Sequence, residues 1–308
     1  MSAALRIVEG GLFTTVQDLG RIGHQQVGVP PSGALDPISL RTANLILGNP
    51  PGMAGLEMCR IGCTIEVEAE SARMVLAGAG VGRPMLESFV LRRGEVLRLG
   101  RVAGGACYLA VEGGFAMAPV LGSLSTYTRA GFGGLRGGRL QAGDRLPLVR
   151  PAAEARRERR LPHPVPAERD RPLRVILGPQ DDHFTEAAID ALLSADFTVT
   201  PEADRMGLRL SGPLLAHSGP PEIATDGNAT GALQVPGSGQ PIALLPDRHT
   251  SGGYPKICTV ITADLHRLGQ SVPGTVLRFE AVAPEQARVA LQRLETAMAG
   301  MADLLREA

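Results

Sequence analysis

The sequence contains no tryptophan, three tyrosines and a single lysine among its 308 residues. Its 31 basic residues are balanced by 31 acidic ones, so the formal net charge at pH 7 is zero. A protein that binds nucleic acid needs a basic surface, and binding of single strands also needs aromatic rings on which bases stack. We therefore exclude nucleic acid as an expected partner.

Long apolar runs are missing as well. No stretch approaches the roughly 18 consecutive apolar residues of a membrane-spanning helix. The first residues, MSAALRIVEGGLFTTV, also lack the apolar core of a signal peptide. We expect a cytoplasmic protein that has no membrane segment.

Cysteine is scarce: the sequence has Cys59, Cys63, Cys107 and Cys258. These residues form no C-x-x-C pair, and no histidine lies at the spacing of a zinc finger. We expect reduced, buried thiols and no metal site.

The length of the chain exceeds that of a usual single core, so we expect two compact units. Residues 151–172, PAAEARRERRLPHPVPAERDRP, are rich in arginine and proline, a composition typical of a linker. Its first part could form a short exposed helix, which the later prolines end. The sequence thus predicts an N-terminal β domain with a long polar binding loop (1–150), this linker, and a C-terminal β-barrel domain (173–282).

Most of the chain reads as short β-branched runs separated by glycine, for example CTIEVEAE and ACYLAVEGG. A helix is predicted over 37–49, because Pro37 follows the capping residue Asp36 and a Gly-Asn pair ends the segment. A second helix is expected over 183–195. Residues 283–308 repeat apolar side chains every three or four positions, which predicts an amphipathic helix that packs on the body or, alternatively, binds a partner. The expected fold class is mainly β, with two closed or partly closed barrels and few helices.

Nucleotide-binding and hydrolase motifs are absent from the sequence. The only lysine follows a proline, so no Walker loop exists, and GAGVGR at 78–83 is followed by no helix of the length that a Rossmann fingerprint needs. Neither G-x-S-x-G nor H-E-x-x-H occurs. The chain itself is not expected to hold ATP phosphates in a known loop.

Residues 14–37, TTVQDLGRIGHQQVGVPPSGALDP, show hardly any strand or helix pattern. Long irregular segments inside compact domains are often binding loops. Ser32, Gly33 and Asp36 are the best candidates there, although Asp36 also fits a plain helix cap.

Two further segments carry polar side chains. GPQDDHF at 178–184 places His183 and two carboxylates between a strand and a helix, where Asp182 or Thr185 could simply cap the helix. In DRMGLRL, the fork of Arg205 could grip a carboxylate, or it could form an ordinary salt bridge to Asp204.

Lys256, in DRHTSGGYPKI, is the one lysine against thirty arginines. An ammonium is a compact charge with three rotatable donors, whereas a guanidinium is planar and keeps its proton. A surface position would tolerate the exchange, so a lone lysine indicates a site where arginine fails; a leftover surface lysine is the alternative.

The neighbours of Lys256 point to the same chemistry. Gly252 and Gly253 let backbone N–H groups approach a ligand, and Tyr254 shares one strand face with the lysine. Asp247 could hold Arg248 or Lys256 in place, and Gln234 adds an amide that recognises carbonyl groups. Together these residues favour an anion or a developing oxyanion as the ligand.

The segments TTVQDLGRIGHQQVGVPPSGALDP, GPQDDHF, DRMGLRL and DRHTSGGYPKICTVITADL, in this order, resemble the biotin-dependent carboxyltransferase family of the allophanate hydrolase subunit 2 type, which includes the C-type subunit of 5-oxoprolinase. The resemblance runs from about Arg6 to Glu280. It implies two cyclophilin-like β-barrel units. His249 and Ser251 fall where relatives are expected to vary.

The resemblance also implies an activity and partners. It suggests a protein that works beside a smaller partner of the allophanate hydrolase subunit 1 type (the B-type subunit of 5-oxoprolinase) and a third partner (the A-type subunit), opening 5-oxo-L-proline to L-glutamate with ATP. Other relatives carry carboxylate from carboxybiotin to urea, or antagonise an inhibitor of a sporulation kinase. With one lysine and no Met-Lys-Met motif, this sequence offers no biotin attachment site.

The leading hypothesis is therefore a lactam hydrolase subunit. In it, Lys256 stabilises an oxyanion or a phosphorylated intermediate, Arg205 or Arg248 holds the substrate carboxylate, and Asp247 orients the cations. ATP is expected to bind with or through the partner subunits. The competing hypothesis is a regulatory module whose cleft binds a partner's loop.

Overall fold

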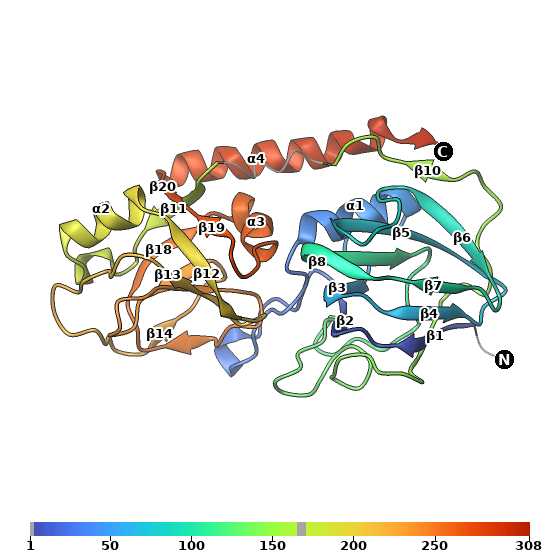
Figure 1. Cartoon of the computed structure of the whole chain (residues 1–308), viewed down its shortest axis with the longest axis horizontal. Coiled ribbons are helices and arrows are strands. Elements are labelled where there is room, and N and C mark those ends of the chain that lie inside the picture. The colour runs from blue at the N-terminus through green and yellow to red at the C-terminus, as the bar shows by residue number, and fades with distance from the viewer. Residues whose placement is uncertain (1–2, 165–170) are drawn as a thin grey trace. The chain divides into compact units, whose positions relative to one another are not determined.

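The computed structural model describes residues 3–164 and 171–308 (Figure 1). These residues form two compact units: unit 1 comprises the described residues of 1–21, 32–166 and 297–308, and unit 2 those of 22–31 and 167–296. The bounds differ from those that composition suggested. Residues 22–31 of the long polar stretch belong to unit 2, and the end of the chain belongs to unit 1.

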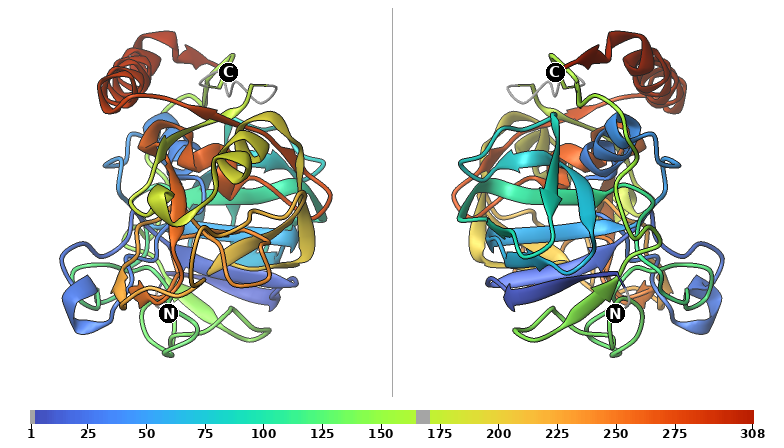
Figure 2. Two further views of the ribbon diagram at one scale, coloured as in Figure 1. Left: turned by 90° about the vertical axis from the view of Figure 1, so that its left-hand side faces the viewer. Right: turned by 90° about the vertical axis from the view of Figure 1, so that its right-hand side faces the viewer.

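Unit 1 contains two antiparallel sheets around a shared core, visible in the right-hand panel of Figure 2. The first sheet has the order β7 (Val96–Arg98), β4 (Thr64–Val67), β1 (Ala4–Glu9), β9 (Arg145–Pro147). The second has the order β2 (Phe13–Gln17), β3 (Gly55–Ile61), β8 (Arg101–Val111), β5 (Ser71–Gly80), β6 (Ser88–Arg92). Alternate residues of both sheets, such as Ile65 and Leu76, are buried in the core.

Helix α1 (Pro37–Leu47) begins as the sequence predicts and ends two residues earlier, directly before the Gly-Asn pair. Asp36 Oδ1 accepts a hydrogen bond from Ser39 N at 2.9 Å, and Gly48 adopts a left-handed φ of 76° that ends the helix. The helix packs against β5 and β8, where Tyr108 Oη accepts a hydrogen bond from Asp36 N at 2.8 Å. The cap role of Asp36 is confirmed.

Unit 2 is built on an eight-stranded sheet of described residues, which faces the viewer in the left-hand panel of Figure 2. Its order is β19 (Val276–Leu277), β12 (Phe197–Ala203), β13 (Gly207–Ser211), β16 (Ile242–Leu244), β15 (Ala232–Gln234), β18 (Lys256–Val260), β11 (Leu173–Leu177), β20 (Phe279–Ala281). The two edge strands, β19 and β20, are separated only by Arg278, so the edges of the sheet come together in a nearly closed barrel. The mainly β fold class is confirmed.

A two-stranded ribbon, β14 (Asp226–Gly227) with β17 (Ser251–Gly252), accompanies this barrel. The remaining elements of unit 2 are helices α2 (Glu186–Ser194) and α3 (Leu265–Gly269) and the short 3-10 turns η1 (Gln25–Val27), η2 (Asp181–His183) and η3 (Thr262–Asp264). Thr185 Oγ1 caps α2 by accepting from Ala188 N, so Asp182 is not the cap. No described helix is long and apolar enough to span a membrane.

Helix α4 (Pro284–Gly300) confirms the predicted amphipathic segment but ends before the C-terminus. In unit 2, its buried Ala290, with Ala287 and Leu294, packs against Ile261 and Ala263. The helix therefore packs on the body there, as the apolar stripe predicts. A 3-10 turn, η4 (Met301–Leu304), and strand β21 (Arg306–Glu307) follow, and β21 pairs with β10 (Arg159–Arg160) in unit 1.

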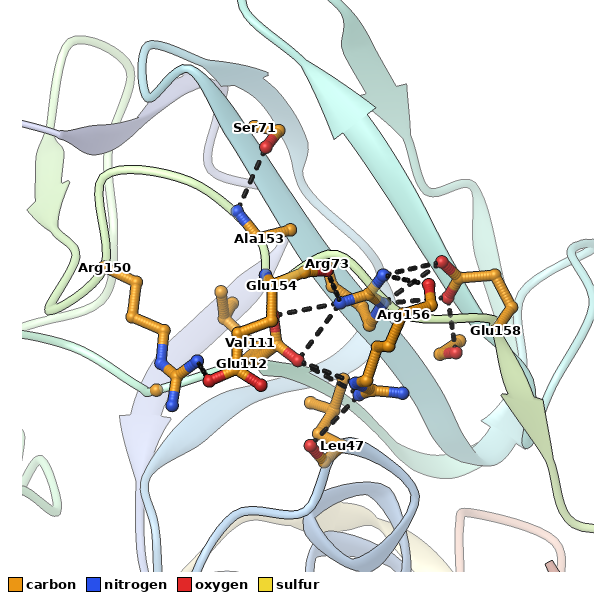
Figure 3. Close-up of polar contacts among 12 residues, drawn as sticks. Leu47, Ser71, Arg73, Val111, Glu112, Arg150, Ala153, Glu154, Arg156 and Glu158 are labelled. Atoms are coloured by element: carbon orange, nitrogen blue, oxygen red, sulfur yellow. Dashed lines mark hydrogen bonds and ion pairs between the residues drawn. The ribbon is translucent and has the colours of Figure 1, made fainter. Parts of the chain in front are cut away.

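The Arg/Pro-rich segment is not a free linker over its first half (Figure 3). Arg73 of β5 is buried and bonds Glu112 at 3.1 Å and Glu158 at 3.0 Å, and Arg156 also bonds Glu112. Arg73 additionally donates to the backbone oxygen of Glu154 at 2.9 Å. These contacts bind residues 154–158 to the sheet of unit 1 without a helix, contrary to the expectation of an exposed one; residues 165–170 lie outside the described part.

Candidate functional site

Lys256, the first residue of β18, is buried inside unit 2 with 2% of its surface exposed. Its Nζ lies 2.9 Å from Asp226 Oδ2 in the β14–β17 ribbon, and its backbone N donates to Gln180 Oε1 at 3.1 Å. Gln180 Nε2 in turn donates to the same Asp226 oxygen at 3.1 Å. The lysine is therefore no leftover surface residue, and its carboxylate partner is Asp226, where the sequence suggested Asp247.

Asp247 instead pairs with Arg205, at the turn between β12 and β13. Arg205 Nε and Nη2 donate to the two carboxylate oxygens of Asp247 at 2.9 and 3.0 Å, and both side chains are buried. Asp204, the sequence-based partner, accepts from the backbone N of Met206 at 2.8 Å instead. An internal carboxylate thus already occupies the fork of Arg205.

Arg248 is buried among neutral partners. It donates to Asn228 O at 3.0 Å, Thr230 Oγ1 at 2.8 Å and Gln25 Oε1 at 2.9 Å, and no described ion pair involves it. Burial lowers the pKa of its guanidinium to about 10, so it remains charged at neutral pH. A buried charge without a counter-charge favours an anionic ligand nearby.

Gln25 reaches this cluster from the long polar stretch near the N-terminus, through the part of that stretch that belongs to unit 2. Its amide nitrogen donates to Asn228 O at 2.9 Å and Thr250 O at 3.1 Å, and its amide oxygen accepts a hydrogen bond from Arg248 Nη2. The sequence predicts that this stretch is a binding loop, but the candidates chosen from it were Ser32, Gly33 and Asp36 and did not include Gln25. Two adjacent glutamines, Gln25 and Gln26, amid glycines were the available signal.

Gly252 faces Asp226 in the ribbon and lies over side-chain amides of the barrel. A Cβ atom at Gly252 would lie 2.7 Å from Gln234 Nε2 and 3.1 Å from Asn228 Nδ2, so a larger residue there would have to displace these two amides. Gln234 Nε2 also donates to Asn228 Oδ1 at 3.1 Å. Beyond Gly253, Tyr254 is 43% exposed.

The other residues named from the sequence lie beside this cluster or in unit 1. His183 ends η2 and contributes only backbone hydrogen bonds among those described, such as His183 N to Gln180 O at 3.2 Å. In unit 1, Ser32 adopts a left-handed φ of 53° and its buried Oγ has no described partner. Gly33 follows at φ 89°, and a Cβ there would lie 2.8 Å from Gly20 N. Ser32 and Gly33 thus form a tight backbone turn, and their role in binding stays a prediction.

The site chemistry of unit 2 is thus cationic and rich in amides. Lys256 and Arg248 are buried charges. Arg248 donates to the amide of Gln25, the backbone of Lys256 donates to the amide of Gln180, and Gln234 faces Lys256 across the β15–β18 pair. The described residues contain no group of three or more His, Cys, Asp or Glu side chains that could hold a metal ion. Such a set can bind an anion or stabilise developing negative charge.

Comparisons with known proteins show the family of the chain. Residues 27–281 match the family model "Carboxyltransferase domain, subdomain A and B". The chain is 36% identical over 296 residues to the C-type subunit of 5-oxoprolinase from Escherichia coli, covering 94% of each chain.

Two solved structures are similar over nearly the whole chain. The urea amidolyase of K. lactis superposes with a TM-score of 0.89 at 26% identity, over 100% of this chain and 20% of that one. The urea carboxylase of Kluyveromyces lactis gives 0.87 at 26% identity, over 97% of this chain and 29% of that one. This chain therefore corresponds to only a fraction of those longer enzymes.

Proposed function

This chain belongs to the family of carboxyltransferase domains, subdomain A and B, and from that membership we propose that it is one component of an ATP-dependent 5-oxoprolinase complex. The complex opens 5-oxo-L-proline to L-glutamate. Support comes from the E. coli relative, a 5-oxoprolinase component by name, which this chain matches over 94% of both lengths.

The observation that carries the proposal is the buried Lys256 beside amide donors in unit 2. Opening a lactam places negative charge on the carbonyl oxygen, and a preorganised ammonium stabilises that charge far more in a buried site than in water. Lys256 Nζ already contacts one anionic oxygen, Asp226 Oδ2 at 2.9 Å, which supports this role. Arginine at this position would bring a larger planar group into a packed strand.

The other buried charges take supporting roles in this proposal. Arg248 contributes positive potential from a position fixed by Gln25 and Thr230. Arg205 and Asp247 neutralise each other and hold the β12–β13 turn, so we no longer assign Arg205 to the substrate carboxylate. Asp247 therefore orients Arg205, and we do not assign it to Lys256 or Arg248.

ATP and the partner subunits belong to the proposal as well. The sequence has no Walker loop, and we propose that ATP binds with or through the smaller partner of the allophanate hydrolase subunit 1 type (B-type) and the third partner (A-type). ATP would supply the phosphoryl group that activates the lactam oxygen. The chain's own residues would hold the substrate and stabilise charge.

The second candidate is the carboxyltransferase part of a urea carboxylase, which the Kluyveromyces lactis structure favours. That chemistry needs biotin, and the lone Lys256 is buried and paired, so it is no biotin attachment residue. A carrier chain would have to bring biotin. We rank this candidate second because this chain covers only 25% of the "Putative urea carboxylase" of Emericella nidulans, at 32% identity, but 94% of the E. coli relative, at 36% identity.

The test is substrate-dependent ATP hydrolysis by the complex reconstituted with both partner subunits. Wild type should hydrolyse ATP when 5-oxo-L-proline is added, and Lys256→Arg should lose turnover by about 100-fold or more. Arg209→Lys is the matched control, because Arg209 lies in an exposed pair with Glu202. Undiminished turnover of Lys256→Arg would remove the proposed role. Turnover with urea after a biotin carrier chain is added would establish the second candidate. Partner binding without any turnover would establish a regulatory module.

A further inference from the structure

The Lys256–Asp226 pair is unequal in its exposure to solvent. The lysine side chain is 2% exposed, whereas the side chain of Asp226 is 50% exposed. A buried ammonium has lost its hydration and needs an anion beside it. Among the described residues, the carboxylate that meets this need comes from the surface side, where a soluble anion would also arrive.

Asp226 is held by donors that would serve any carboxylate. Oδ2 receives hydrogen bonds from Lys256 Nζ at 2.9 Å and from Gln180 Nε2 at 3.1 Å, and Oδ1 receives one from the backbone N of Gly227 at 2.7 Å. The hydrogen bond from Lys256 is the largest cause that lowers the pKa of Asp226 below its usual value. Asp226 is therefore an anion across the neutral range.

The element that carries Asp226 is small. Strand β14 has two residues, both exposed, and among the described strands it pairs only with the two residues of β17. Lys256 and Gln180 instead lie on the barrel and its adjoining turn, β18 and the residue before η2. Withdrawal of Asp226 breaks few backbone hydrogen bonds and leaves the two donors in place.

We propose that Lys256 Nζ and Gln180 Nε2 form a binding site for an anionic oxygen, that Asp226 fills this site in the free protein, and that a small incoming anion displaces it. The chemistry of the ligand is a carboxylate or the phosphoryl oxygen of an activated intermediate. The assignment of this anion to the lactam reaction rests on the proposed function; the site itself does not. Gly252, opposite Asp226, leaves the amides of Gln234 and Asn228 close to the same place.

The experiment is thermal unfolding of the full chain with Asp226→Ala, in sodium formate or in sodium chloride of equal concentration. Without added anion, the variant should unfold at a lower temperature than wild type because its buried ammonium is unpaired. Formate should raise the midpoint by about 3 °C at about 0.5 M relative to chloride, as expected for a weak ligand that binds only the folded state. Wild type should show a smaller difference, because formate must first displace Asp226.

Two control variants locate the response. Asp196→Ala removes a carboxylate of similar exposure, 53%, from an exposed pair with Arg278, and it should respond to formate no more than wild type. The double variant Asp226→Ala with Lys256→Met removes the ammonium and should lose the formate response. An equal response of Asp226→Ala and Asp196→Ala, or a retained response in the double variant, overturns the proposal.

The remaining outcomes are also decisive. If Asp226→Ala does not fold in chloride, recovery of folded protein in formate supports the site. If it folds in neither salt while the double variant does fold, the proposal is overturned. Inorganic phosphate is then tested in place of formate. The anion that raises the unfolding midpoint of Asp226→Ala more indicates whether the site prefers a phosphoryl oxygen or a carboxylate. A formate response without any turnover of 5-oxo-L-proline refutes the proposed function alone; turnover without a formate response refutes the site alone.

Discussion

At the scale of single residues, the buried charges of unit 2 differ in the partners that they have. Arg205 and Asp247 neutralise each other, whereas the buried Arg248 has only neutral partners among those described. A buried guanidinium depends on every hydrogen bond that it makes, because a lost partner leaves an unsatisfied N–H away from water. Gln25 supplies one of these bonds and two further bonds to backbone oxygens.

We predict that Gln25→Ala lowers the free energy of unfolding by about 1–3 kcal/mol. Its neighbour offers a matched control: Gln26 Nε2 makes an exposed hydrogen bond to Gly23 O, and Gln26→Ala should change stability by less than about 0.5 kcal/mol. Urea unfolding of both variants measures the difference. Equal effects of the two substitutions would contradict the role of Gln25.

At the scale of elements, the Arg-rich segment shows how composition and structure diverge. Its arginines suggest an exposed linker, but Glu158 and Arg156 join Arg73 and Glu112 in a largely buried network on unit 1 (Figure 3). Burial alone would raise the pKa of Glu158, but hydrogen bonds from Arg73 and Ser88 outweigh it and hold this pKa below its usual value. The carboxylate form is therefore bound more strongly in the folded state.

This shift gives a pH-dependent prediction. A group whose pKa is lowered by folding stabilises the protein above its unfolded pKa and loses that contribution as pH falls through its folded pKa. Wild type should exceed Glu158→Gln in stability by about 2 kcal/mol at pH 7, and the difference should shrink as pH falls below the ordinary value of 4.5. Chemical unfolding across pH 3–7 measures it. Glu154 lies in an exposed pair with Arg150, so Glu154→Gln should show no comparable loss of stability. A stability difference between wild type and Glu158→Gln that persists at pH 3 would contradict the role given to the Glu158 carboxylate.

At the scale of the whole molecule, the units are not contiguous in sequence. Residues 22–31 belong to unit 2 although unit 1 precedes and follows them, and residues 297–308 return to unit 1. A fragment cut at the Arg/Pro-rich segment would therefore lack Gln25, and Arg248 would lose an acceptor. Cutting the chain where its composition changes does not isolate a complete unit.

We predict that the fragment 167–296 gains stability when residues 22–31 are fused to its N-terminus through a flexible Gly/Ser linker. The physical reason is that the fused segment restores the bonds of Gln25 to Arg248, Asn228 and Thr250. Thermal unfolding of both fragments measures the gain. The same fusion with Gln25→Ala should gain less; if it gains as much, the contacts of Gln25 are not the cause.

The sequence by itself determined the features that depend on near neighbours. Helix α1 could be predicted from its caps, helix α4 from its apolar stripe, and the mainly β class from short runs between glycines. That Lys256 is not an ordinary surface residue could be predicted because it is the single lysine. Caps, stripes and turns are set within a few residues along the chain, so a sequence displays them directly.

Only the tertiary structure decided which charges meet. Lys256 pairs with Asp226 from 30 residues away, and Arg248 bonds Gln25 from 223 residues away. Asp247, adjacent to Arg248 in sequence, faces Arg205 instead. Such pairs are fixed by the register of strands and by the path of the chain between units, and no local pattern of residues records either of these.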